Sequence, residues 1–194
     1  YVAGGGTWDE ERFRWWRVLG TIRIAPEQPA GYSLSLFPWA DSDGDGCAND
    51  ELVLARDSLD PPTLNVHCEP VTGRWYSPYD GLTWTQASDV TIDHVVSLKE
   101  AWDSGAFAWS EQRRIAFAND LDDHRTLRVV TESIDTSKQT NDPKNWMPPL
   151  ESDWCRFLSD YIAIKARWSL RMDQAEPDEI RSMLTERCPD QRVA

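Results

Sequence analysis

Residues 90–100 read VTIDHVVSLKE, and this stretch decides the local fold. The first three residues are apolar or β-branched, which favours a β-strand that runs directly into Asp93 and His94. Because neighbouring side chains of a strand alternate in direction, Asp93 and His94 are expected to point to different sides of a strand end. Ser97 and Glu100 then have the spacing of a capping box, which predicts the start of a helix.

Downstream, the pattern alternates between short helices and one strand. The first helix is predicted to run through Trp102 and to stop near Gly105. Ser110 is placed to cap a second helix through Phe117, and residues 127–130 are apolar enough for a second strand. Two further helices are predicted nearer the C-terminus, one starting at residue 152 or 153 and one covering about 177–187.

The N-terminal part of the chain is richer in turns. Residues 7–10 (TWDE) form a capping box that predicts a helix ending at Gly20, and residues 21–24 form a short strand candidate. The stretch that follows contains SDGDG and SLDPP, so it is predicted to be surface loop. Residues 71–79 suggest a hairpin.

These elements predict one α+β domain over residues 1–194. Its core is expected at about residues 71–150, with an N-terminal helix and loop region at 7–70 and C-terminal helices at 151–188. The chain contains no stretch of about 18 to 20 consecutive apolar residues, so we expect no membrane span. With no coiled-coil heptad in the sequence, we expect a monomer.

The net charge limits the class of partner. The chain carries 33 acidic and 20 basic side chains, a formal charge of -13. Proteins that hold polyanions through their overall field cluster lysine and arginine instead. A nucleic-acid role would therefore need a local device such as a metal ion, and substrate binding would be weak and sensitive to salt.

The cysteines and the first residues of the chain indicate the cellular compartment in which the protein works. Cys47, Cys68, Cys155 and Cys188 lack the spacing of a zinc cluster, which favours two disulfides. Four cysteines allow three connectivities, and we favour the local pairing, 47 with 68 and 155 with 188. The alternative to disulfides is four buried free thiols in a reducing cytosol. The chain begins at Tyr1 without a hydrophobic leader, as expected if a secretory signal has been removed. We therefore expect a secreted, extracellular protein.

Only one of the three histidines stands out. His67 lies in a loop and His124 lies in a charged run, so both are expected to be solvated. His94 follows an apolar strand and a carboxylate, which fits either a catalytic histidine or a hydrogen-bonded structural one.

Three segments together carry a family resemblance: TIDHVVSLKEAW (91–102), RRIAFANDL (113–121) and TLRVVTESIDTSKQTNDPKNWMPP (126–149). They resemble the secreted microbial branch of the HNH, or ββα-metal, endonucleases, the extracellular DNases, in which Asp-His, Asn and a final Asn-x-x-Lys recur in this order. Further matches run from about Gly31 to the C-terminal helix, so the resemblance covers most of the chain. It implies a ββα-metal core with surrounding helices and two disulfides.

The resemblance also implies roles for single residues. His94 would be the general base that deprotonates water, and Asp93 would hold a divalent metal ion. The second ligand would be Asp135 in SIDTSK, where relatives usually carry Asn. Asn119 would hold the loop that orients the base, although it could also cap the C-terminal end of the preceding helix.

Three basic residues are candidates for contacts with substrate phosphates. Lys138 follows Asp135 by three residues and so lies on nearly the same helical face. Arg114 adds positive charge, and Arg56 could replace a basic residue that relatives carry after Cys47. The alternative for each is a solvated surface group.

A second metal site is suggested by the loop DSDGDG. Asp41, Asp43 and Asp45 occupy positions one, three and five of an EF-hand loop, but position twelve is Leu52 in place of glutamate. The loop is thus a candidate for a structural Ca²⁺, and turn chemistry alone also explains it.

The sequence therefore predicts a secreted metal-dependent endonuclease that hydrolyses DNA with little sequence preference, with RNA as a further substrate left open. We expect one divalent ion, Mg²⁺ or Mn²⁺ ahead of Zn²⁺. The alternative from another class is a catalytically silent, Ca²⁺-stabilised extracellular binding module on the same scaffold.

Overall fold

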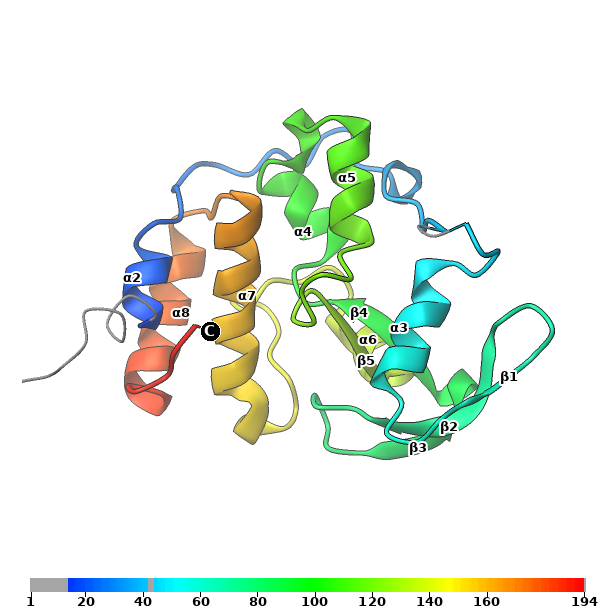
Figure 1. Ribbon diagram of the computed structural model, residues 1–194. Coiled ribbons are helices and arrows are strands. Elements are labelled where there is room, and N and C mark those ends of the chain that lie inside the picture. The colour runs from blue at the N-terminus through cyan, green and yellow to red at the C-terminus, as the bar shows by residue number, and fades with distance from the viewer. Residues whose placement is uncertain (1–13, 42–43, 194) are drawn as a thin grey trace, which may run out of the picture.

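A computed structural model describes residues 14–41 and 44–193 (Figure 1). Its α-helices are α2 (Trp15–Leu19), α3 (Asn49–Asp57), α4 (Leu98–Asp103), α5 (Glu111–Ala118), α6 (Glu132–Lys138), α7 (Trp154–Trp168) and α8 (Ala175–Arg187). The 3-10 helices are η1 (Leu34–Leu36), η2 (Ala87–Asp89), η3 (Ala106–Ala108) and η4 (Glu151–Asp153). The strands are β1 (Thr63–Leu64), β2 (Pro70–Tyr76), β3 (Thr83–Gln86), β4 (Val90–His94) and β5 (Leu127–Thr131). The α+β class is confirmed.

Two small antiparallel sheets organise the strands. One has the order β1-β2-β3, and the other pairs β4 with β5. In the second sheet Asp93 lies opposite Arg128 and His94 lies opposite Leu127. Helix α6 follows β5 without a loop and packs against both strands (Figure 1). The result is a strand–strand–helix unit, with α4 and α5 inserted between the two strands.

The helices around the strand β4 begin where the capping residues predict. Ser97 Oγ accepts the Glu100 N–H at 3.1 Å at the start of α4. Ser110 Oγ accepts the Arg113 N–H at 3.3 Å at the start of α5. Each hydroxyl pairs one of the backbone donors that the first turn of a helix leaves unpaired. Both predicted helices, and both strands of the second sheet, are confirmed.

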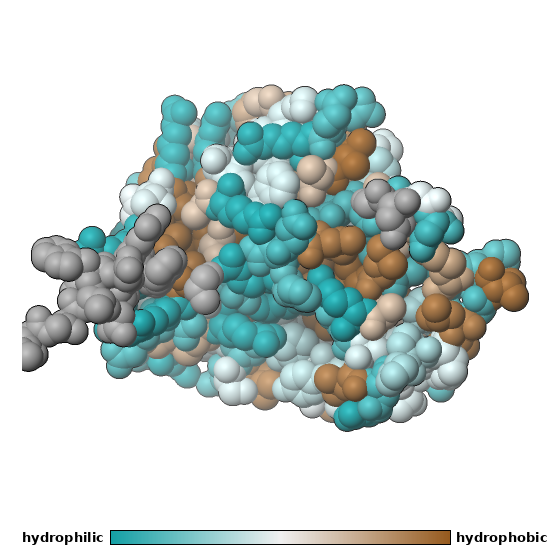
Figure 2. Space-filling model, in the orientation of Figure 1, coloured by the Kyte–Doolittle hydropathy of each residue, from teal (hydrophilic) through white to brown (hydrophobic). Residues whose placement is uncertain are grey.

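Two apolar clusters support this unit. The larger lies among α2, α4, α5, α7 and α8 and contains Phe117, Phe157 and Tyr161. The smaller packs α3 against the strands through Val53, Trp75 and Leu127. On the face drawn in Figure 2 the hydrophobic residues form separate patches in a mostly hydrophilic surface. Among the described residues, every helix is too short or too polar to cross a membrane.

Both disulfides form in the predicted pairing. Cys47 is bonded to Cys68, and Cys155 is bonded to Cys188. The first ties the segment before α3 to the β1–β2 turn, and the second ties the start of α7 to the end of α8. The two crosslinks are the pattern expected of a protein from an oxidising compartment.

Removing the second disulfide should destabilise the protein measurably. The crosslink spans 33 residues, and its loss frees the unfolded chain from a closed loop. We expect Cys155→Ser combined with Cys188→Ser to lower the free energy of unfolding by about 2 to 5 kcal/mol. Urea denaturation under non-reducing conditions measures this. A double variant as stable as the parent would mean that the α7–α8 packing needs no crosslink.

The structure corrects three expectations in the N-terminal half. The stretch predicted to be loop contains α3, a nine-residue helix. The strand expected at residues 21–24 is reduced to one bridge between Ile24 and Met172. The hairpin expected within 71–79 is a single strand, β2, which pairs with β1 and β3. The capping box at residues 7–10 lies outside the described residues.

Candidate active site

Asp93 is buried at the end of β4 and is held by two donors. Its side chain has 4% exposure. Oδ1 accepts a hydrogen bond from Lys138 Nζ at 2.5 Å, and Oδ2 accepts one from Tyr79 Oη at 2.6 Å. Lys138 Nζ also donates to the His94 carbonyl at 2.8 Å. The ammonium group therefore neutralises Asp93 and fixes the strand end at the same time.

Asp135 comes to Asp93 from α6, as the resemblance implies for the second metal ligand. The two carboxyl groups lie close enough to interact electrostatically. Burial and the negative charge of Asp93 together raise the pKa of Asp135 to about 7, although the Lys138 ammonium acts to lower it. Two carboxyl groups this close repel each other, and the Lys138 ammonium on Asp93 offsets part of that repulsion.

These two acids fit a divalent cation. Carboxylate oxygens are the ligands that hard cations such as Mg²⁺ and Mn²⁺ prefer. Asp135 is half-buried, whereas Asp93 is 4% exposed and both of its oxygens already accept hydrogen bonds, so a cation would reach the pair through Asp135. The chemistry of the donor set is therefore compatible with the predicted ion.

His94 points to the other side of the strand end, and its tautomer follows from its partner. Nε2 lies 2.9 Å from the carbonyl oxygen of Ala118. Because a carbonyl only accepts, Nε2 carries the hydrogen and Nδ1 keeps the lone pair of the neutral ring. Burial lowers the pKa of His94 to about 4, while the bond to Ala118 and the charge of Asp93 raise it. The ring is therefore neutral at pH 7, with the lone pair of Nδ1 unprotonated.

The His94 ring is stacked and borders a pocket. It lies 5.4 Å from the Trp39 ring and 6.3 Å from the Phe117 ring, measured between centroids. A pocket of about 320 Å³ opens beside it, lined also by Phe37 and Leu98. His94 and Ser35 are thus the polar residues of a largely apolar recess.

The Asn119 side chain makes four hydrogen bonds to the segments around His94. Its Oδ1 accepts from the Ala40 N–H at 2.9 Å and from Asn49 Nδ2 at 3.1 Å. Its Nδ2 donates to the carbonyls of Pro38 and Ile115, both at 2.9 Å. The side chain therefore joins the Trp39 segment to the end of α5, where Ala118 holds His94. Asn119 also stands at the C-cap of α5, so both expected roles describe the same residue.

The basic candidates differ from expectation. Lys138 is fully buried on Asp93, which corrects the expectation that it meets substrate phosphates from the surface. Arg114 donates to the Trp109 carbonyl at 2.6 Å and lies over the Trp102 ring, so its charge is used within the fold. Arg56 lines a separate pocket and is bonded there to Asp57 and to the Leu127 carbonyl.

The DSDGDG loop uses its carboxylates on its own backbone. Asp41 accepts the N–H groups of Gly44 and Gly46 at 2.8 and 2.9 Å, and Asp45 accepts that of Cys47 at 2.8 Å. Such contacts are typical of aspartate turns. Asp43 lies outside the described residues, and a calcium ion here stays a prediction.

Sequence reasoning missed two contacts of the site. Tyr79, which donates to Asp93, lies in a stretch read as a hairpin, and its burial depends on contacts with Trp146 and Phe157. Trp39 lies 55 residues before His94, so no local pattern links the two.

A second acidic group lies elsewhere in the fold. Ligand atoms of Glu27, Glu100 and Asp142 lie within 4.8 Å of one another, and the spacing of these residues in the sequence does not predict the group.

Comparison with known proteins places the chain in one family with a secreted protein of Arthroderma benhamiae. No family model matches the chain, and no solved structure matches it. It is 40% identical over 169 residues to an "Uncharacterized secreted protein" of Arthroderma benhamiae, an alignment that covers 86% of this chain and 81% of the relative. The protein is therefore a secreted member of the family to which this Arthroderma benhamiae protein belongs.

Proposed function

We propose that the protein is a metal-dependent endonuclease that hydrolyses phosphodiester bonds in DNA, with an HNH-type core formed by β4, β5 and α6. One observation carries the proposal. The end of β4 presents a neutral imidazole with Nδ1 as its basic nitrogen on one side and a pair of oxygen acids, Asp93 and Asp135, on the other. Phosphodiester hydrolysis uses both a general base and a cation held by oxygen ligands, and adjacent residues of this strand end supply His94 and Asp93 for the two roles.

Each residue of the site has a separate role in the proposed reaction. His94 Nδ1 takes the proton from the attacking water, while the bond from Nε2 to Ala118 keeps the ring in place. Asn119 positions Ala118 and the Trp39 segment, so it acts through His94. Asp93 and Asp135 would hold the divalent cation. When bound, the cation supplies positive charge that stabilises the charge on the phosphate oxygens and the leaving oxygen.

Cleavage of plasmid and of linear DNA tests the proposal. The purified protein is incubated with EDTA, Mg²⁺, Mn²⁺ or Zn²⁺, and the products are separated by size. We expect internal cuts that require a divalent ion and no cuts in EDTA. Parallel RNA substrates define the range of polymers. A protein that leaves every nucleic acid intact with every ion is not a nuclease.

A second candidate, the catalytically silent binding module, is favoured by Lys138. Its ammonium group already neutralises Asp93, so this carboxylate is stable in the fold without an ion. On that hypothesis the aromatic recess beside His94 would serve recognition alone. The cleavage assay separates the two candidates, because the binding module would cut no nucleic acid under any condition.

Substitutions at Asp135 test its place in the site. Asn keeps an oxygen donor and is the residue that the resemblance implies at this position, whereas Ala removes the donor. We expect Asp135→Asn to retain measurable DNA cleavage and Asp135→Ala to lose most of it. Rates are measured over a range of metal concentrations. Equal rates for Asp135→Ala and the parent would remove Asp135 from the site.

A further inference from the structure

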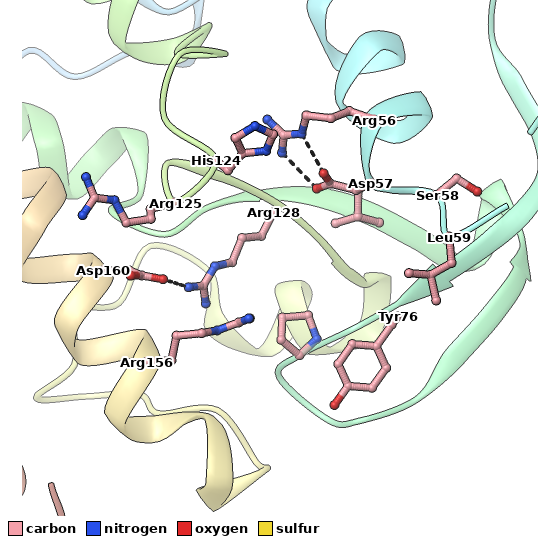
Figure 3. A pocket seen from close by; sticks show the side chains of 12 residues that line it. Arg56, Asp57, Ser58, Leu59, Tyr76, His124, Arg125, Arg128, Arg156 and Asp160 are labelled. Carbon is pink, nitrogen blue, oxygen red and sulfur yellow. Dashed lines mark hydrogen bonds and ion pairs between the residues drawn. The ribbon is translucent and has the colours of Figure 1, made fainter. Parts of the chain in front are cut away.

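A second pocket, of about 480 Å³, lies apart from the recess beside His94 (Figure 3). Its walls come from α3, β2, β5, α7 and the segment before β5. Four arginines line it: Arg56, Arg125, Arg128 and Arg156. His124 lies beside the Arg56 guanidinium in Figure 3, and Tyr76 stands at the opposite wall. Residues far apart in sequence are thus gathered around one opening.

The charge of this lining is the reverse of the charge of the whole chain. Acidic residues outnumber basic ones by 33 to 20 in the sequence, yet four arginines and only two aspartates, Asp57 and Asp160, line the pocket. Arg125 and Arg156 are paired with carboxylates nearby, Asp123 at 2.7 Å and Asp153 at 3.0 Å. Such pairs hold the guanidinium groups in fixed positions.

Two guanidinium nitrogens of the arginines that line the pocket have N–H groups without a hydrogen-bond partner among the described residues. Arg56 grips Asp57 through Nε and Nη2 at 2.6 and 2.9 Å, and Nη2 also donates to the Leu127 carbonyl at 2.8 Å. Its Nη1 is buried and has no hydrogen-bond partner among the described residues. Arg128 is 7% exposed and forms an ion pair with Asp160 through Nη2; its Nη1 lacks a hydrogen-bond partner among the described residues and forms an ion pair with Asp153 Oδ2 at 3.6 Å. An unpaired buried donor is costly, so an acceptor that reached either nitrogen would stabilise it.

The pocket is also close to the candidate active site. Arg128 is the cross-strand partner of Asp93, and its guanidinium lies 5.9 Å from the centre of the Tyr79 ring. Arg56 binds the carbonyl of Leu127, which is the cross-strand partner of His94. Arg56 and Arg128 therefore contact or belong to β5, the strand that pairs with the Asp93 and His94 end of β4.

We propose that the pocket lined by Arg56, Arg128 and Arg156 binds a phosphate group. Guanidinium groups match the oxygens of a phosphate with paired, charge-assisted hydrogen bonds, and four of them, each held by a carboxylate, line this one pocket. The phosphate belongs to a polynucleotide bound across β5, next to the bond that is cut. That source of the phosphate rests on the proposed nuclease function, and free inorganic phosphate would present the same chemistry.

Calorimetric titrations in EDTA, where no cleavage occurs, test the site independently of catalysis. The probes are inorganic phosphate and a short single-stranded DNA. The variants are Arg156→Glu, at a side chain that is 54% exposed and so suited to replacement, and Arg56→Gln. The matched control is Arg181→Glu on α8, which is 56% exposed and lies outside the pocket. Thermal melting verifies that each variant folds.

We expect both pocket variants to weaken phosphate binding about tenfold or more and the control to leave it unchanged. Competition between DNA and phosphate identifies the polynucleotide as a source, and binding of phosphate alone identifies the free ion. Either result supports the pocket as a phosphate site, even if the protein cuts nothing. Absence of phosphate binding by the parent, or equal binding by parent and pocket variants, overturns the proposal.

Discussion

Replacing His94 with alanine is expected to lower the rate of DNA cleavage by about 10²- to 10⁴-fold, the usual contribution of a general base. The imidazole is neutral at pH 7 because burial lowers its pKa to about 4, and its Nε2 bond to Ala118 leaves Nδ1 as the only basic nitrogen. Alanine removes this base and leaves the carboxylates in place. Initial rates of plasmid cleavage at a fixed metal concentration measure the loss.

The matched control is His67→Ala. His67 is exposed in the β1–β2 turn, so its removal deletes an imidazole without touching the strand end. We expect this variant to cleave at the rate of the parent. Circular dichroism and thermal melting of both variants separate lost chemistry from lost structure. A folded His94→Ala variant that cleaves as fast as the parent would refute the role of general base.

Local signals in the sequence predicted the frame of the site well. The capping serines at 97 and 110 fixed the starts of α4 and α5, and the apolar run before Asp93 fixed β4. These features depend on neighbours within a few residues, and such interactions are visible in a sequence. The position of Asp135 on the helix after the second strand came instead from the family resemblance.

Long-range contacts account for what the sequence did not predict. Lys138 ends a short polar helix, which is typical of a solvated lysine, yet its burial depends on Asp93, 45 residues earlier. Helix α3 lies in a stretch rich in turn residues, and Val53 and Trp75 stabilise it from across the fold. Arg56 and Arg156 line the same pocket although they lie 100 residues apart, and no sequence pattern predicts that they are neighbours.

Replacing Lys138 with methionine is expected to lower the free energy of unfolding by about 3 to 5 kcal/mol. Methionine has similar length but no charge, so Asp93 would remain buried beside Asp135 with Tyr79 as its only partner of the original two. Breaking a buried pair in this way leaves an uncompensated charge, which costs more than the pair itself contributes. Urea denaturation in EDTA measures the loss.

The same variant tests whether the acids at this site accept a metal. A cation bound by Asp93 and Asp135 would replace the missing positive charge, so Mg²⁺ or Mn²⁺ should raise the melting temperature of Lys138→Met more than that of the parent. The control is Asp93→Asn combined with Lys138→Met, which removes both charges; it should be more stable than the single variant and gain little from the ion. If the ion raises all three melting temperatures equally, the cation binds elsewhere, and Asp93 serves the fold through Lys138 alone.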